Sequence, residues 1–198
     1  MKKILALILV VGCIFAFASC GLFPGTETPD DSYAIPDIQA KIDASAPKGA
    51  DITVTFKTTL GDLNGSYDVT YNEDGTANVD YSYEQFNTIT AGSSELKSTY
   101  TGSVTVAADG SVSGTLSTEA LNAVSFDLKL DESKLSNVAI NAGVLSANVK
   151  AADTAAVLGV ALDYDVQLTV VTGTNGVTSM TVAYTANLGA VEIVTLYK

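Results

Sequence analysis

The chain has 198 residues, with 22 acidic residues against 10 lysines, no Arg, His or Trp, and a formal net charge of −12. Nucleic-acid backbones bind clusters of Lys and Arg, so we expect no nucleic-acid partner for so acidic a chain. Its hydrophobic content of 47% with 16% charged residues excludes wholesale disorder.

The first nineteen residues have the pattern of a secretory signal peptide. Lys2 and Lys3 precede an apolar stretch over residues 4–17, which is too short for a membrane-crossing helix. Ala18 and Ser19 then lead directly into Cys20. This segment resembles the signal peptide and lipobox of bacterial lipoproteins, with Phe17 at the position where Leu is usual.

The resemblance implies that the Cys20 thiol receives a diacylglyceryl group and that the signal is cut just before it. Acyl chains on Cys20 would hold the exported chain at a membrane without spanning it. Gly21 follows the cysteine, where an inner-membrane lipoprotein usually has Asp, so we expect the outer membrane if the source has two membranes. The alternative is an ordinary secreted protein cut at a nearby small residue.

Composition divides the rest of the chain in two. Residues 20–34 hold the lipidated cysteine and a segment rich in Pro, Gly and acidic residues, which predicts a flexible tether. Residues 35–198 form a single β domain. It begins with one short helix near 36–46, because Pro36 suits a first helical turn and Pro47 ends the apolar spacing that starts at Ile35.

From Ile52 onward, apolar residues alternate with Thr, Ser, Asp and Asn, which is the pattern of strands with one dry face. We count nine or ten strands, with apolar runs at 52–60, 67–71, 77–83, 100–106, 124–130, 160–170, 180–188 and 191–197. The middle of the chain is less clear, since residues 119–123 and 151–159 have helical composition without a distinct apolar face.

The turns predict antiparallel hairpins between consecutive strands. Three-residue loops ending in Gly75, Gly110 and Gly176 suit a bulged hairpin turn. The loop at Gly176 sets Val170 opposite Met180, which keeps every dry residue on one face. The same logic predicts a two-residue turn at 64–65, with Leu60 opposite Val69, and a bulge or tight turn at 141–143.

These elements predict an all-β fold, an antiparallel up-and-down meander curled into a barrel or half-barrel and capped by the helix. A two-sheet sandwich is the alternative. A transmembrane barrel with its dry face toward lipid is a third arrangement, disfavoured by the tether, the lipobox and the lack of aromatic girdles.

The absence of His and the small number of Cys residues restrict the catalytic and metal sites that the chain could form. Without His, and with Cys20 alone after removal of the signal, Ser-His-Asp triads, Cys-His pairs, multi-Cys zinc sites and an intramolecular disulfide are impossible. Asp163 and Asp165 would share a strand face, but a solvated face is the better interpretation. Residues 72–78 partly imitate a calcium loop, yet a hairpin turn explains them. We therefore expect no catalytic residue, no metal and no cofactor.

Tyrosines are the remaining unusual feature. Four of them fall on the predicted dry side of adjacent strands, Tyr67, Tyr71, Tyr81 and Tyr83, and Tyr100 joins them if the next strand pairs alongside. Tyrosines with an apolar body and a polar tip line pockets for amphipathic ligands. They are also good cross-strand core partners, which is the interpretation the sequence favours.

Two functions from different classes remain. The first is a lipid-anchored envelope or surface lipoprotein without catalysis, which has a structural role or contacts a surface macromolecule. The second is a carrier or sensor that binds an apolar or amphipathic small molecule inside the curved sheet. The second resembles lipocalin-like and periplasmic lipoprotein-carrier architectures at the level of fold alone.

Overall fold

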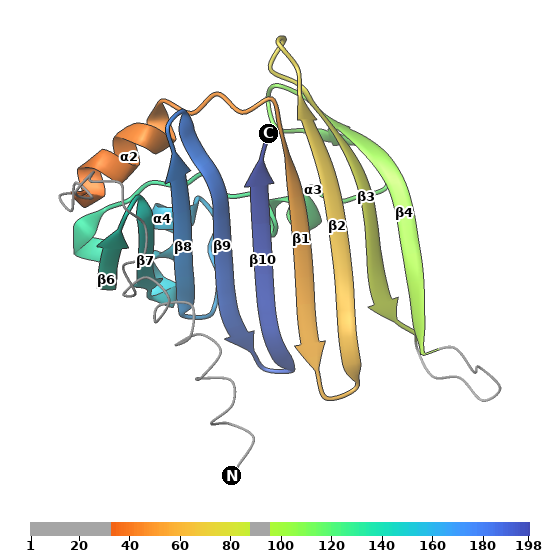
Figure 1. Ribbon diagram of the computed structural model, residues 1–198. Helices are drawn as coiled ribbons and strands as arrows, with labels where there is room; N and C mark the ends of the chain where they lie inside the picture. The colour runs from red at the N-terminus through yellow and green to blue at the C-terminus, as the bar shows by residue number, and fades with distance from the viewer. Residues whose placement is uncertain (1–32, 88–95) are drawn as a thin grey trace, which may run out of the picture. The chain divides into compact units, whose positions relative to one another are not determined.

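Ten antiparallel strands form one sheet, in the order β5-β4-β3-β2-β1-β10-β9-β8-β7-β6 (Figure 1). The computed structural model describes residues 33–87 and 96–198. The predicted signal peptide, Cys20 and nearly all of the predicted tether lie outside the described residues. The strands are β1 (Gly49–Thr58), β2 (Gly61–Tyr71), β3 (Ala77–Phe86), β4 (Lys97–Val106), β5 (Val112–Ser113), β6 (Leu135–Asn141), β7 (Val144–Val149), β8 (Val166–Gly173), β9 (Gly176–Ala186) and β10 (Gly189–Tyr197).

The first and last strands meet in the middle of the sheet. Nine residue pairs join β1 to β10, from Ala50 opposite Tyr197 to Thr58 opposite Gly189. Each remaining neighbour pair joins two strands that are consecutive in the chain, and helix α4 lies in the connection between β7 and β8. The fold is therefore two five-stranded meanders joined through the two ends of the domain, and the connection from β5 to β6 crosses from one edge of the sheet to the other.

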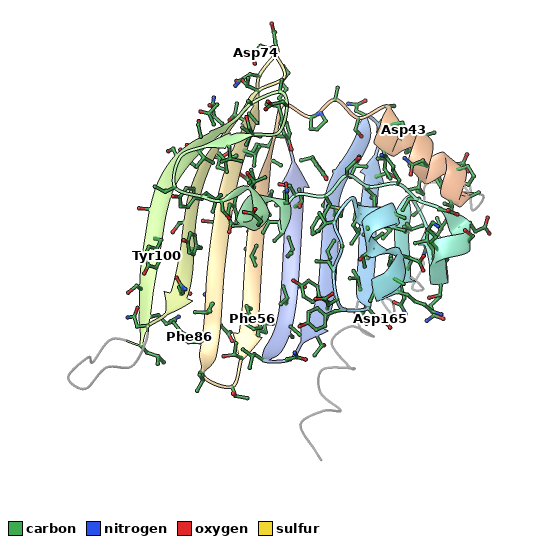
Figure 2. The ribbon with its side chains drawn as sticks, turned by 180° about the vertical axis from the view of Figure 1, so that it is seen from behind. Asp43, Phe56, Asp74, Phe86, Tyr100 and Asp165 are labelled. Atoms are coloured by element: carbon green, nitrogen blue, oxygen red, sulfur yellow. The ribbon has the colours of Figure 1, made fainter. Side chains whose placement is uncertain are left out.

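One face of the sheet is apolar and is covered by helices. The helices are α2 (Ile35–Asp43), α3 (Thr118–Asn122) and α4 (Thr154–Leu158), with single 3-10 turns at Glu132–Lys134 and Ala151–Asp153. Figure 2 looks onto this covered face. The largest fully buried side chains come from both the sheet and its covering helices: Ile38, Leu145, Leu158, Leu168, Met180 and Ile193.

Helix α2 confirms the predicted N-terminal helix. Pro36 lies in its first turn, and the Asp37 carboxylate accepts a 2.7 Å hydrogen bond from the Ala34 backbone N–H, as an acidic residue at a helix start does. Ile35 and Ile38 are buried and Ile42 is half-buried, so the predicted apolar face packs on the sheet.

The sheet does not close into a barrel, and because all described strands belong to one sheet, a two-sheet sandwich is also wrong. The coarser prediction of an antiparallel all-β meander is confirmed. The meander is interrupted once, because β5 and β6 are consecutive in the chain but lie at opposite edges of the sheet. The alternation of apolar and polar residues does not predict this interruption.

The run predicted as a strand at 124–130 is instead a connecting segment on the apolar face. Val124 and Leu128 are buried and Phe126 is half-buried against the core, while Ser125 and Asp127 are exposed, which reproduces a period of two without strand pairing. Its backbone bonds to helices: Lys129 N–H donates to the Val157 carbonyl at 2.8 Å, and Leu130 N–H donates to Gln39 Oε1 at 2.6 Å. The segment thereby ties α2 to α4.

The hairpin predictions are mostly confirmed. Val170 faces Met180 and Val69 faces Val79, and Gly143 with a positive φ completes the tight turn before β7. The predicted turn at 64–65 is wrong, because Gly65 lies inside β2 opposite Val54. A β-carbon there would lie 3.4 Å from the Tyr67 ring and 3.6 Å from the β-carbons of Val54 and Tyr83, so Gly65 is packed within the strand and is not at a turn.

Candidate functional site

Two of the five tyrosines proposed from the sequence are core residues. Tyr67 and Tyr81 are opposite each other on β2 and β3 and are only 8% and 7% exposed. The Tyr81 ring lies over Gly102 on β4, where a β-carbon would be 2.5 Å from its hydroxyl oxygen, and that hydroxyl hydrogen-bonds Thr115. Burial, and then the neighbouring Tyr83, raise the pKa of Tyr67. Both side chains are therefore packed within the core.

Tyr83 and Tyr100 continue a row of stacked rings to the edge of the sheet. The ring centroids of Tyr81 and Tyr83 are 5.9 Å apart, and those of Tyr83 and Tyr100 are 5.4 Å apart. Tyr83 is half-buried, and Tyr100 is 46% exposed. The structure thus brings four of the five tyrosines together, whereas Tyr71 lies toward the opposite end of the strands, beside Tyr197.

An apolar patch surrounds the outer end of this row. It consists of dry-face side chains on β1 to β4 that remain partly exposed: Val54, Phe56, Leu63, Tyr83 and Tyr100. In Figure 2 no helix or connecting segment crosses the strands around Phe56 and Tyr100. At the same end of the sheet, adjacent hairpin tips expose Leu60 and Leu188. The chain therefore covers the β7–β10 part of its apolar face more fully than this part.

A cavity of about 310 Å³ lies at the other end of the sheet, below the C-terminal end of α2. Its apolar lining comes from α2, from the connecting segment and from β9 and β10: Ile42, Pro47, Phe126, Leu128, Val177, Met180 and Tyr197. Asp43, Ser45, Asp127 and Lys129 supply its polar lining, and Asp127 and Lys129 form an exposed ion pair at 3.0 Å. The volume is at the lower end of the range for small-molecule pockets.

Tyr197 is the lining residue with the most altered chemistry. Burial, and then the neighbouring Tyr71, raise its pKa to about 12. The neutral phenol is the form that this environment stabilises. Sequence reasoning placed Tyr197 in a terminal strand but did not connect it to Ile42 or Leu128, because only the tertiary fold brings these residues together.

The carboxylates considered from the sequence have structural roles. Asp165 accepts a 2.9 Å hydrogen bond from the Ala151 backbone N–H, and both Asp163 and Asp165 precede β8 instead of sharing its polar face. Asp74 accepts from the Thr76 N–H and hydroxyl within the β2–β3 turn, and these bonds lower its pKa. Across residues 33–87 and 96–198, no three acidic or cysteine side chains gather into a metal-binding cluster.

The uncovered face of the sheet is polar. Asp51, Asp68 and Asp80 face one another in register across β1, β2 and β3. Lys198 Nζ lies 2.6 Å from the Asp51 carboxylate and 3.0 Å from that of Asp68, and its hydrogen bonds to the two carboxylates raise the pKa of the ammonium group. The C-terminal residue thereby partly neutralises the acidic row.

Comparison with known proteins adds no assignment, since no family model and no curated protein matches the chain. Every helix in the described part of the chain falls short of the length and apolar character that a membrane-crossing helix requires.

The raised pKa of Tyr197 predicts a loss of stability at high pH. The folded state holds this proton more tightly than the unfolded state, so the contribution is complete below about pH 10 and is lost as pH rises toward about 12. A shift of this size corresponds to roughly 2–3 kcal/mol. Urea unfolding at pH 9 and pH 11.5 should show a smaller decrease for Tyr197→Phe than for the unsubstituted protein. The exposed-site control Tyr100→Phe should retain the full decrease, and an equal decrease in all three proteins would contradict the assignment.

Proposed function

We propose that the chain is an exported lipoprotein, anchored to a bacterial membrane through Cys20, whose sheet domain contacts another macromolecule and does not catalyse a reaction. The apolar patch is the observation that supports a role in contacting another macromolecule. A chain that buries residues such as Leu145 and Leu168 almost completely leaves Phe56 and Leu63 partly exposed on the same face as Tyr100. Contiguous exposed apolar surface of this kind is typical of interaction sites.

Residue type supports a macromolecular partner for the patch. Aromatic side chains are enriched at the centres of protein interfaces, where they bury a large area with little loss of conformational freedom. The stacking of Tyr83 between Tyr81 and Tyr100 fixes these rings before any partner arrives. A surface that is already ordered loses less side-chain entropy on binding.

The carrier or sensor function is the second candidate, and the cavity below α2 is the observation that favours it. Its ligand would lie against Ile42, Leu128 and Met180, away from the tyrosines singled out in the sequence. Met180 is a flexible, polarisable lining residue of the kind that adapts to varied apolar ligands. A bound apolar mass in native mass spectrometry of the purified chain would favour this candidate, and its loss in Val177→Phe would place the ligand in the cavity.

Anchoring through Cys20 predicts where the protein is found in cells. Full-length chain expressed in a bacterium should partition into the membrane fraction and carry the added mass of acyl chains, because the Cys20 thiol is the acceptor. Cys20→Ser should move the protein out of the membrane fraction. Cys13→Ser, which changes the other cysteine within the predicted signal, should leave the anchoring intact. Membrane retention of the unacylated Cys20→Ser protein would contradict lipid anchoring.

The contact role predicts a face-specific cross-link. Benzoylphenylalanine placed at Phe56, in the patch, should give a discrete macromolecular adduct when irradiated in the cells of origin. The same group placed at Thr55, which points to the opposite face, should give none. Adducts of equal yield from both positions, or from neither, would contradict a partner at the patch.

A further inference from the structure

The edge of the sheet at β4 is open along most of its length. The short strand β5 pairs with only Thr105 and Val106 of β4. Gly114 then lies against the next two residues, since a β-carbon on it would be 3.2 Å from the Ser103 carbonyl oxygen. From Lys97 to Gly102, none of the described residues forms a strand on the outer side of β4. An open length of six residues is about 20 Å of backbone.

This edge has only one of the devices that usually prevent strands from adding to a sheet, the charged side chain of Lys97 at its end. Its pairing with β3 is regular from Ala77–Val106 to Phe86–Lys97, without a bulge. Residues 97–102 contain no proline and no acidic side chain, although the chain as a whole carries a net charge of −12. Because Lys97 is ion-paired with Glu84 of the same molecule, the regular backbone from Ser98 to Gly102 remains a template for another strand.

The opposite edge of the sheet is protected. The register of β6 with β7 shifts between Ser136 and Ala139, and Asn137 has a φ of 51°. Bulges of this kind twist an edge and interrupt its row of hydrogen-bonding groups. The contrast between the two edges shows that only the β4 edge presents a regular backbone to a partner.

We propose that two copies of this chain pair antiparallel through β4, with Tyr100 at the centre of the two-fold contact. Residues n and 200 − n then face each other, so every dry-face residue meets a dry-face residue of the second copy, as pairing between strands requires. Tyr100 meets its own counterpart, and the stacked row of Tyr81, Tyr83 and Tyr100 becomes continuous across both molecules. A second copy is the occupant because this register brings together the open lengths of two edges from Ser98 to Gly102, and neither carries an acidic side chain.

Charge also fits this arrangement. Lys97 is the only charged residue on the open length of β4, and it lies 3.0 Å from the Glu84 carboxylate. In the proposed register the paired length runs from Ser98 to Gly102, and Lys97 lies just beyond it, toward Ser103 of the second copy, whose hydroxyl donates a hydrogen bond to Asp80. Each copy thus brings a lysine toward an acidic part of the other, and no acidic side chains meet along the paired edges.

The inference goes beyond the proposed function and does not depend on it. The contact is made by the edge of the sheet, while the proposed macromolecular partner binds its apolar face. Pairing at β4 would place the apolar patches of the two copies side by side on one continuous sheet, which doubles the apolar surface open to a partner.

Opposed charges at two exposed positions test the pairing. In the dimer, Thr99 of each copy faces Thr101 of the other copy, so the contact contains two such pairs. The variant T99K/T101K therefore sets two like-charge pairs across the contact, whereas T99K/T101E sets two opposite-charge pairs. The two variants share Lys at position 99, which faces Glu84 within the same molecule, and they differ only in the sign of the charge at position 101, which faces Ser82.

Sedimentation equilibrium over a range of concentrations is the measurement, using the chain from residue 20 onward with Cys20→Ser so that neither acyl chains nor a disulfide can link two copies. We expect the parent and T99K/T101E to dimerise, and T99K/T101K to dimerise at least tenfold more weakly than T99K/T101E. A parent protein that stays monomeric at all concentrations overturns the proposal. So do equal dissociation constants for the two variants, which would place the contact elsewhere. Cross-linking from Phe56 reports separately on the macromolecular partner.

Discussion

The pairing of β1 with β10 is the constraint on which the rest of the structure depends. The nine pairs between these strands join the two meanders into one sheet. Backbone bonds extend the join past the last pair, because Lys48 N–H donates to the Lys198 carbonyl at 2.7 Å and Lys198 N–H donates to the Gly49 carbonyl at 2.9 Å. With the ends of the domain at the centre of the sheet, strands from the middle of the chain form its edges. The open edge at β4 and the bulged edge at β6 both follow from this topology.

The uneven covering of the apolar face decides which surfaces remain for function. Helix α2, helix α4 and the connecting segment bond to one another over β7 to β10, through Gln39, Lys129 and Leu130. The same layer leaves a cavity where α2 ends above Met180 and Tyr197. Over β1 to β4 the cover is reduced to α3 and the residues around Leu116, and the patch around Phe56 remains partly exposed. The two candidate functions therefore use different parts of the apolar face: the carrier function uses the cavity below α2, and the contact function uses the exposed patch around Phe56.

Local pattern predicted the hairpins well, since alternation and glycine turns act over a few residues. The register at Val170 and Met180 follows from the requirement that dry residues share a face. The same reasoning failed at 124–130, where a segment crossing an apolar surface buries alternate residues just as a strand does. It also failed at Gly65, where a glycine that suggested a turn lies inside a strand, paired with Val54. Long-range features such as the β1–β10 join, the cavity and the edge at β4 have no local signal.

Native-state hydrogen exchange tests the role of the β1–β10 join most directly. If the join holds the sheet together, the amides of β1 and β10 should exchange only through global unfolding, with an opening free energy equal to that of the whole domain. The β6 edge and the end of β4 near Lys97 should exchange through smaller openings. Exchange of the β8 to β10 amides at a lower opening free energy than those of β1 to β3 would contradict this role. It would show that the two meanders unfold separately and that the β1–β10 pairing between them is weak.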